Sequence, residues 1–84
     1  MKVRVTKKLS ADQIIIPIHT EFIKLQDFMK FANICESGGM AKGFIQNEQV
    51  RVNDEVCVQR GKKLRPGDTV SFMGNVWAVA QEDV

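Results

Sequence analysis

Two short segments with the apolar period of an α-helix follow one another in the middle of this 84-residue chain. In the first, over residues 25–33, apolar residues recur at i, i+3, i+4 and i+7: Leu25, Phe28, Met29 and Ala32. In the second, which begins after Ser37, the apolar residues are Met40, Ala41, Phe44 and Ile45. Each set forms one face of a helix, so the sequence predicts two amphipathic helices. Helices this short are marginal in isolation, so tertiary packing must hold them.

The second helix begins with an unusual number of glycines. Ser37 is a good N-cap, because its hydroxyl accepts a hydrogen bond from a free backbone N–H one turn along. Gly38, Gly39 and Gly43 follow, and each glycine inside a helix costs up to about 1 kcal/mol relative to alanine. Either something approaches this backbone closely, or the second helix nestles against the first. Asn47 is the predicted left-handed stop of this helix.

After the helices, apolar residues alternate in short runs, which predicts strands. Residues 50–58 predict a hairpin with Asn53 and Asp54 at its turn. Residues 69–73 and 76–79 predict a second hairpin, with Gly74-Asn75 as a type II′ turn because glycine comes first.

The segments before the first helix are less decisive. Residues 1–11 alternate weakly and predict an edge strand or a loose arm. Residues 14–18 are β-branched except for Pro17, which removes a ladder donor, so they predict an edge strand. Residues 20–24 predict another short extended segment, and these two pieces pair either with each other or with the C-terminal strands. Trp77 is predicted to be a core or rim residue rather than a base-stacking one.

Composition limits the class of protein. A chain of this length has room for one domain, and its 44% apolar and 26% charged residues are typical of a soluble globular protein. No apolar run approaches the roughly 20 residues that a membrane helix needs. The N-terminal cations are not followed by a long apolar segment and cleavage site, so we expect no secretory signal and a cytoplasmic protein.

Catalytic and metal-binding patterns are poorly represented. Cys35, Cys57 and the single His19 have no zinc-ligand spacing, and we predict that both cysteines are small, buried or half-buried apolar residues. His19 has no partners for a nucleophile, and the glycines do not spell a nucleotide-binding loop. We therefore predict no catalytic residue, no metal ligand and no cofactor.

The distribution of charge points to a phosphate-binding surface, although the net charge is only +2. Residues 60–65 supply four cations and no acid, and the glycine-rich helix start offers free N–H groups and a partial positive charge. The alternative is that residues 37–39 only form a tight turn between helices. The candidate contacts are Lys24, Lys30, Ser37, Gly38, Gly39, Lys42, Arg51, Arg60, Lys62, Lys63 and Arg65.

Four motifs occur in order and with suitable gaps: residues 23–30 (Ile-Lys-Leu-Gln-Asp-Phe-Met-Lys), 37–42 (Ser-Gly-Gly-Met-Ala-Lys), 50–53 (Val-Arg-Val-Asn) and 60–68 (Arg-Gly-Lys-Lys-Leu-Arg-Pro-Gly-Asp). They resemble the RNA-binding domain named after ribosomal protein S-four, and above all its small, stand-alone, YaaA-type bacterial members. The resemblance implies an α+β fold, with two short helices packed on a small, bent antiparallel sheet (the alpha-L RNA-binding motif). The expected domain is 1–84, with the core motif at 20–72, an N-terminal strand or arm at 1–19, and a C-terminal hairpin strand and tail at 73–84.

The resemblance also implies binding of structured, often ribosomal, RNA through the helix pair and the adjacent loop. The matching positions are Lys24, Ser37, Lys42, Arg51, Arg60, Lys62 and Lys63. Gly38 stands where many members have an arginine, and Gln26 and Asp54 also depart from the pattern. The first departure shifts weight to backbone N–H groups and to the basic loop. Side chains cannot read the deep major groove of double-stranded RNA, so we expect contacts to backbone phosphates.

The expected function is therefore that of a non-enzymatic, ribosome-associated RNA-binding protein. The alternative is a protein-interaction module, in which the same surface docks an acidic partner or the edge strand at 14–18 joins another sheet. An accessory role in RNA modification is third, because domains of this family also occur attached to RNA-modifying enzymes.

Overall fold

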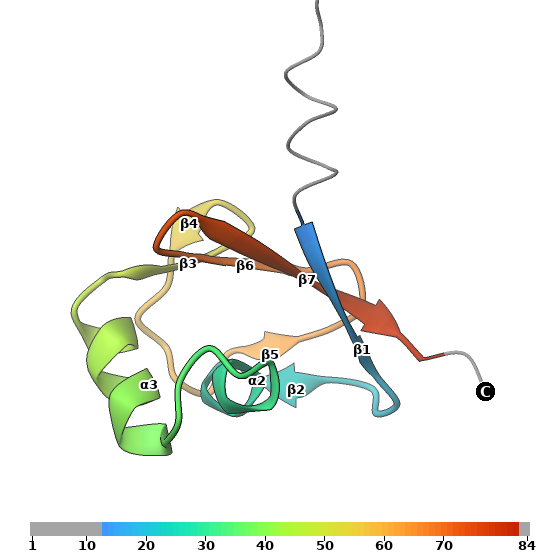
Figure 1. Ribbon diagram of the computed structural model, residues 1–84, viewed down its shortest axis with the longest axis horizontal. Helices are drawn as coiled ribbons and strands as arrows, with labels where there is room; N and C mark the ends of the chain where they lie inside the picture. The colour runs from blue at the N-terminus through green and yellow to red at the C-terminus, as the bar shows by residue number, and fades with distance from the viewer. Residues whose placement is uncertain (1–12, 83–84) are drawn as a thin grey trace, which may run out of the picture.

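The computed structural model describes residues 13–82. Residues 1–12 of the predicted N-terminal strand or arm therefore lie outside the described residues. In this part the elements, in chain order, are β1 (Gln13–Ile18), β2 (Ile23–Lys24), α2 (Leu25–Phe31), α3 (Gly38–Gln46), β3 (Val50–Val52), β4 (Glu55–Val56), β5 (Lys63–Leu64), β6 (Thr69–Phe72) and β7 (Asn75–Gln81). Five strands form a sheet in the order β1-β7-β6-β3-β4, and β2 pairs with β5 in a separate ribbon. Both helices lie on one side of the larger sheet (Figure 1). The predicted α+β fold with two short helices is confirmed.

The sheet is mixed rather than antiparallel throughout, because β1 runs parallel to β7. A parallel pair needs a long crossover connection, and here both helices and most of the strands provide it. Residues 14–18 thus pair with the last strand, which is one of the two predicted alternatives. Residues 20–24 contribute β2, which pairs with residues 63–64, and neither alternative included that partner. β1 is an edge strand, as predicted. The carbonyl of Ile18 points toward β7, where it accepts a hydrogen bond from Glu82 N–H. Because the backbone polar groups of successive strand residues point in opposite directions, the nitrogen of Pro17, which has no hydrogen to donate, points away from β7.

The core lies between the helices and the inner face of the sheet. The first helix buries Leu25, Phe28 and Met29 completely, as its apolar period predicts. The ring of Phe44 on α3 packs against the ring of Phe72 on β6, with their centroids 4.7 Å apart. Trp77 is only 8% exposed, so it is a core residue. No charged or polar side chain is buried among residues 13–82, so this core is held by apolar packing.

Two details of α3 differ from prediction. Met40 is 43% exposed, because the buried face of this short helix is narrower than its apolar pattern and is made by Ala41 and Ile45. Asn47 has a φ of −87° and is not left-handed. The left-handed residue is Glu48, with a φ of 62°, because the helix ends at Gln46 and the turn that closes it falls one residue later.

The β3–β4 hairpin has the predicted turn, with φ of 52° at Asn53 and 71° at Asp54, as in type I′. The β6–β7 turn is instead centred on Met73 and Gly74, whose φ values are 51° and 84°, and not on Gly74-Asn75. It is therefore a type I′ turn and not type II′. Both registers bury the same strand faces, so the apolar pattern does not distinguish them.

No helix among residues 13–82 has the length and apolar character to cross a lipid bilayer. The same residues contain no group of three His, Cys, Asp or Glu side chains placed to hold a metal ion.

Asn53 is the residue whose replacement should most weaken the hairpin region. Its Oδ1 accepts from the Thr69 backbone N–H at 3.0 Å, its Nδ2 donates to Asp68 Oδ1 at 3.1 Å, and its backbone is left-handed. We expect Asn53→Ala to lower the free energy of unfolding by about 1–3 kcal/mol in urea titrations. Asn47→Ala is the matched control, because Asn47 has negative φ, and its loss should cost much less. Equal effects would contradict this role for Asn53.

The two free cysteines should differ in reactivity. Cys35 is 5% exposed, and burial raises the pKa of its thiol, whereas Cys57 is half-buried. A raised pKa leaves less thiolate at a given pH, by about tenfold per unit, and the thiolate is the reactive form. At pH 8 we expect iodoacetamide to alkylate Cys57 at least about tenfold faster than Cys35, as followed by peptide mass spectrometry. Faster labelling of Cys35 in the folded protein would contradict its burial.

Candidate nucleic-acid interface

The segment at 60–65 is attached to the start of α2 by backbone hydrogen bonds. Leu25 N–H donates to the carbonyl of Lys62 at 2.8 Å, and Gln26 N–H donates to the carbonyl of Arg60 at 3.1 Å. The first N–H groups of a helix have no partner within the helix, so these carbonyls occupy the place of a cap. Lys24 is the N-cap residue and makes no side-chain cap. The basic segment is therefore fixed against the helix and is not a free loop.

The β2–β5 ribbon continues this attachment. Lys24 lies directly opposite Lys63, and Ile23 lies opposite Leu64, which is fully buried. Because side chains alternate along a strand, Leu64 points into the core while Lys63 and Arg65 point out of it. Sequence reasoning expected a basic loop here and missed that two of its residues form a strand.

We call five exposed cations around this junction the basic cluster: Lys24, Arg60, Lys62, Lys63 and Arg65. Among residues 13–82 no carboxylate oxygen lies within 4.0 Å of a charged side-chain nitrogen of the five, although the backbone N–H of Arg65 donates to Asp68 Oδ2 at 2.8 Å. Like charges directly opposite one another in a ribbon are destabilising, so Lys24 and Lys63 repel each other in the free protein. Lys24 also places a cation at a helix N-terminus, where the helix dipole disfavours it. We expect this arrangement to lower stability, and it is suited to an anionic ligand.

Phe22 supports two members of the basic cluster. The ammonium of Lys63 lies 4.8 Å from the centroid of the Phe22 ring, and the guanidinium carbon of Arg65 lies 5.8 Å from it. Both distances are within the range of a cation–π contact. Phe22 was not among the predicted site residues. Its position two residues before Lys24, in a segment predicted to be extended, is the signal that could have found it.

The start of α3 has the predicted geometry. Ser37 is the N-cap, and its Oγ accepts from Met40 N–H at 3.2 Å. A Cβ added at Gly38 would meet no atom within 4 Å, and one at Gly39 would meet only Ser37 Oγ at 3.8 Å. The packing of α3 on α2 therefore does not require these glycines, and the nestling explanation fails for them. Their backbone stays open to a ligand.

Three predicted RNA contacts, Lys30, Lys42 and Arg51, form no hydrogen bond or ion pair with the basic cluster in the part of the chain that the structure describes. Lys42 is exposed on α3, and Lys30 is on the last turn of α2, where its ammonium is 3.8 Å from Asp27. Arg51 lies between the buried Val50 and Val52 on β3, so it points from the sheet face opposite the core. Its guanidinium donates to the Asp54 carbonyl at 3.3 Å. The structure thus separates Arg51 from the face that carries the helices.

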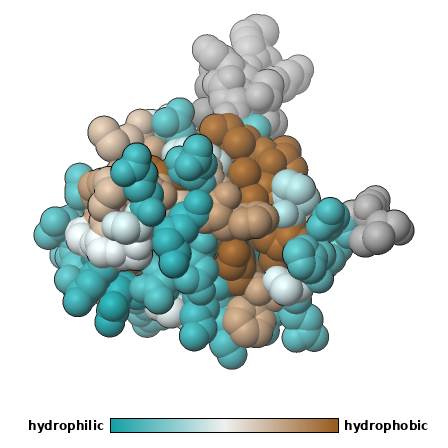
Figure 2. All heavy atoms as spheres, turned by 60° about the horizontal axis from the view of Figure 1, so that its bottom comes forward, coloured by the Kyte–Doolittle hydropathy of each residue, from teal (hydrophilic) through white to brown (hydrophobic). Residues whose placement is uncertain are grey.

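Hydrophilic side chains cover much of the helix side, and hydrophobic residues gather in one area of it (Figure 2).

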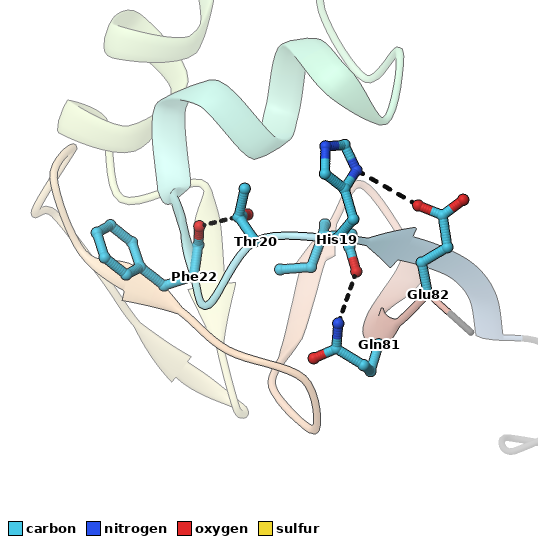
Figure 3. Close-up of polar contacts among 6 residues, drawn as sticks. His19, Thr20, Phe22, Gln81 and Glu82 are labelled. Atoms are coloured by element: carbon cyan, nitrogen blue, oxygen red, sulfur yellow. Dashed lines mark hydrogen bonds and ion pairs between the residues drawn. The ribbon is translucent and has the colours of Figure 1, made fainter. Parts of the chain in front are cut away.

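His19 lies near Glu82, with 3.3 Å between Nδ1 and Oε1 (Figure 3). Both side chains are at least half exposed, so this pair contributes little to stability.

Comparison with known proteins adds three findings. The family model described as S4 domain matches residues 16–80. The probable ribosome maturation protein RlbA of Bacillus subtilis (strain 168) is 49% identical over 59 residues, which is 70% of this chain and 83% of that protein. The solution structure of YbcJ from E. coli, reported to contain an alfaL motif involved in RNA-binding, is 32% identical, with a TM-score of 0.57. That match covers 82% of this chain and 86% of YbcJ.

The unfavourable position of Lys24 can be tested by stability. We expect Lys24→Asp to raise the free energy of unfolding by about 1 kcal/mol at low salt, because aspartate caps the helix, suits its dipole and attracts Lys63. Lys24→Gln should give a smaller gain, and the exposed Lys42→Gln should give none. Urea titrations at low and high salt measure this, since salt screens the charge effect. A loss of stability in Lys24→Asp would refute the proposed repulsion between Lys24 and Lys63 and the unfavourable effect of the helix dipole on Lys24.

Proposed function

The chain belongs to the S4 domain family, and on this premise we propose that it binds structured RNA through backbone phosphates at the basic cluster. The observation that carries the proposal is the Lys24–Lys63 pair. Two exposed lysines lie opposite each other at a helix start, and among the described residues neither forms an ion pair with a carboxylate within 4.0 Å. A polyanion bound there would remove the repulsion, and each neutralised phosphate would release counterions.

The start of α3 provides a second place for a phosphate on the same side of the sheet as α2 (Figure 1). Gly38 and Gly39 leave the backbone accessible, and the helix start carries a partial positive charge. We infer that Lys42 and Lys30 add charge at the periphery. We further infer that Arg51, on the opposite face of the sheet, contributes little.

We propose ribosomal RNA as the target and the cytoplasm as the place of action. The support comes from relatives: one is named a probable ribosome maturation protein, and the other is described as carrying an RNA-binding motif. Both similarities cover more than two thirds of each chain. Binding to duplex backbone fits a surface that is mainly cationic, because A-form RNA is recognised chiefly by shape and by contacts to phosphates and 2′-hydroxyls.

We assign binding rather than catalysis. The chemistry that the described residues bring together is a set of cations and open backbone N–H groups. The chain's one histidine lies in an exposed pair with Glu82, away from a nucleophile arrangement. No step that makes or breaks a covalent bond is needed for the function proposed.

Protein interaction is the second candidate, because β1 is a sheet edge with two exposed isoleucines. Ile14 is 44% exposed and Ile15 is 58% exposed. An extended peptide could add to such an edge, although the missing donor at Pro17 shortens it. Nuclease treatment before purification separates the candidates. Retention that depends on RNA and on salt supports the first, and an acidic protein that persists supports the second.

Charge reversal tests the proposed RNA face. We expect Lys62→Glu with Lys63→Glu to weaken binding of a ribosomal RNA fragment by at least about 100-fold at low salt. The slope of log affinity against log salt should fall in magnitude by about 2, because two phosphate contacts are lost. Filter binding over a salt series measures both quantities, and circular dichroism checks the fold.

The control is Arg51→Glu, which changes charge on the opposite face of the sheet. It should lower the affinity only a few-fold, through the weaker long-range field. Unchanged binding in the double variant would overturn the proposed face. An Arg51→Glu effect of equal size would place the contact on both sides of the sheet.

A further inference from the structure

A hollow of about 390 Å³ lies beside the basic cluster, between the end of β1, β2 and the outer side of α2. Its apolar lining comes from Ile18, Ile23 and two aromatic rings, Phe22 and Phe31. The volume lies at the small end of the range of about 300–1,000 Å³ for ligand sites. Phe31, on the last turn of α2, is 57% exposed, although it belongs to one of the largest apolar residue types. An exposed ring that continues the apolar lining of a hollow marks this surface as a candidate binding site.

The polar groups of the hollow limit what the occupant can be. Thr20 Oγ1 donates to the Phe22 carbonyl at 2.9 Å, and His19 pairs with Glu82 (Figure 3). Lys24 and Asp27 also line the hollow. The carboxylate of Asp27, which also lies 3.8 Å from the Lys30 ammonium, is an acceptor for hydrogen bonds from the amino groups of bases. A flat ring with an amino edge therefore suits this mainly apolar hollow, while the phosphate suits the neighbouring basic cluster.

The hollow and the basic cluster share two residues. Lys24 belongs to both, and the ring of Phe22 both lines the hollow and lies beneath Lys63 and Arg65. Cations that hold a phosphate are thus next to aromatic surface that can stack on a base. In one nucleotide the phosphate and the base are separated only by the sugar, so a single nucleotide can reach both.

We propose that this hollow receives one unpaired base, extruded from the structured RNA whose backbone lies on the basic cluster. This inference rests on the proposed function and adds the class of target: a duplex with a bulged or junction nucleotide. Unpaired bases stack on aromatic side chains, and extrusion is easiest where the base is already unpaired. Two rings can serve one base but cannot follow a single strand, which agrees with a structured target.

The test compares three RNA hairpins of one sequence: fully paired, with a single-nucleotide bulge, and with an abasic residue at the bulge. The abasic RNA keeps the backbone distortion and lacks only the base. We expect the full-length protein to bind the bulged RNA about tenfold more tightly than either of the others, as one stacked base provides. Phe31→Ala should lose this preference and keep the salt-dependent binding of the paired RNA.

Met73→Ala is the matched control, because Met73 is 78% exposed in the β6–β7 turn and does not line the hollow. It should keep the preference. Equal affinity for the three RNAs, or a preference that survives Phe31→Ala, overturns the base site while the proposed function stands. Absence of salt-dependent binding to all three overturns the proposed function and the base site together.

Discussion

The two hydrogen bonds from the start of α2 to the carbonyls of Arg60 and Lys62 are the constraint on which the interface depends. They satisfy N–H groups that have no partner within the helix, so these bonds, rather than the nearby charges, fix the position of residues 60–62. Their effect is to hold a run of cations against a short helix, where it would otherwise be mobile. Leu64, buried beneath the ribbon, adds apolar packing to the same attachment. The basic cluster is thus positioned by backbone bonding and burial, and its charged groups form no ion pair with the carboxylates of residues 13–82.

Local patterns in the sequence predicted most of the elements. The apolar period of Leu25, Phe28 and Met29 identified α2 and its buried face, and Ser37 identified the start of α3. Asn53 identified the first hairpin turn, because few other residues adopt positive φ readily. These features depend on neighbours within one turn of the chain, which is why a single sequence reveals them.

Long-range pairings were beyond the reach of the sequence. Nothing local indicates that β1 joins β7 in parallel, or that Lys24 faces Lys63, since the partners are far apart in the chain. For the same reason Arg51 could not be assigned to a sheet face relative to the helices before the fold was known. The site residues were found by charge, whereas Phe22 and Phe31 look like ordinary core residues until their exposure and the hollow beside them are seen.

The pairing of β1 with β7 also constrains the order of events during synthesis. Ile18 and Gln81 are in contact although 63 positions separate them, so β1 has no partner strand until β7 has been synthesised. We therefore expect the helices and the inner hairpins to form first, and the pairing of β1 with β7 to complete the sheet last.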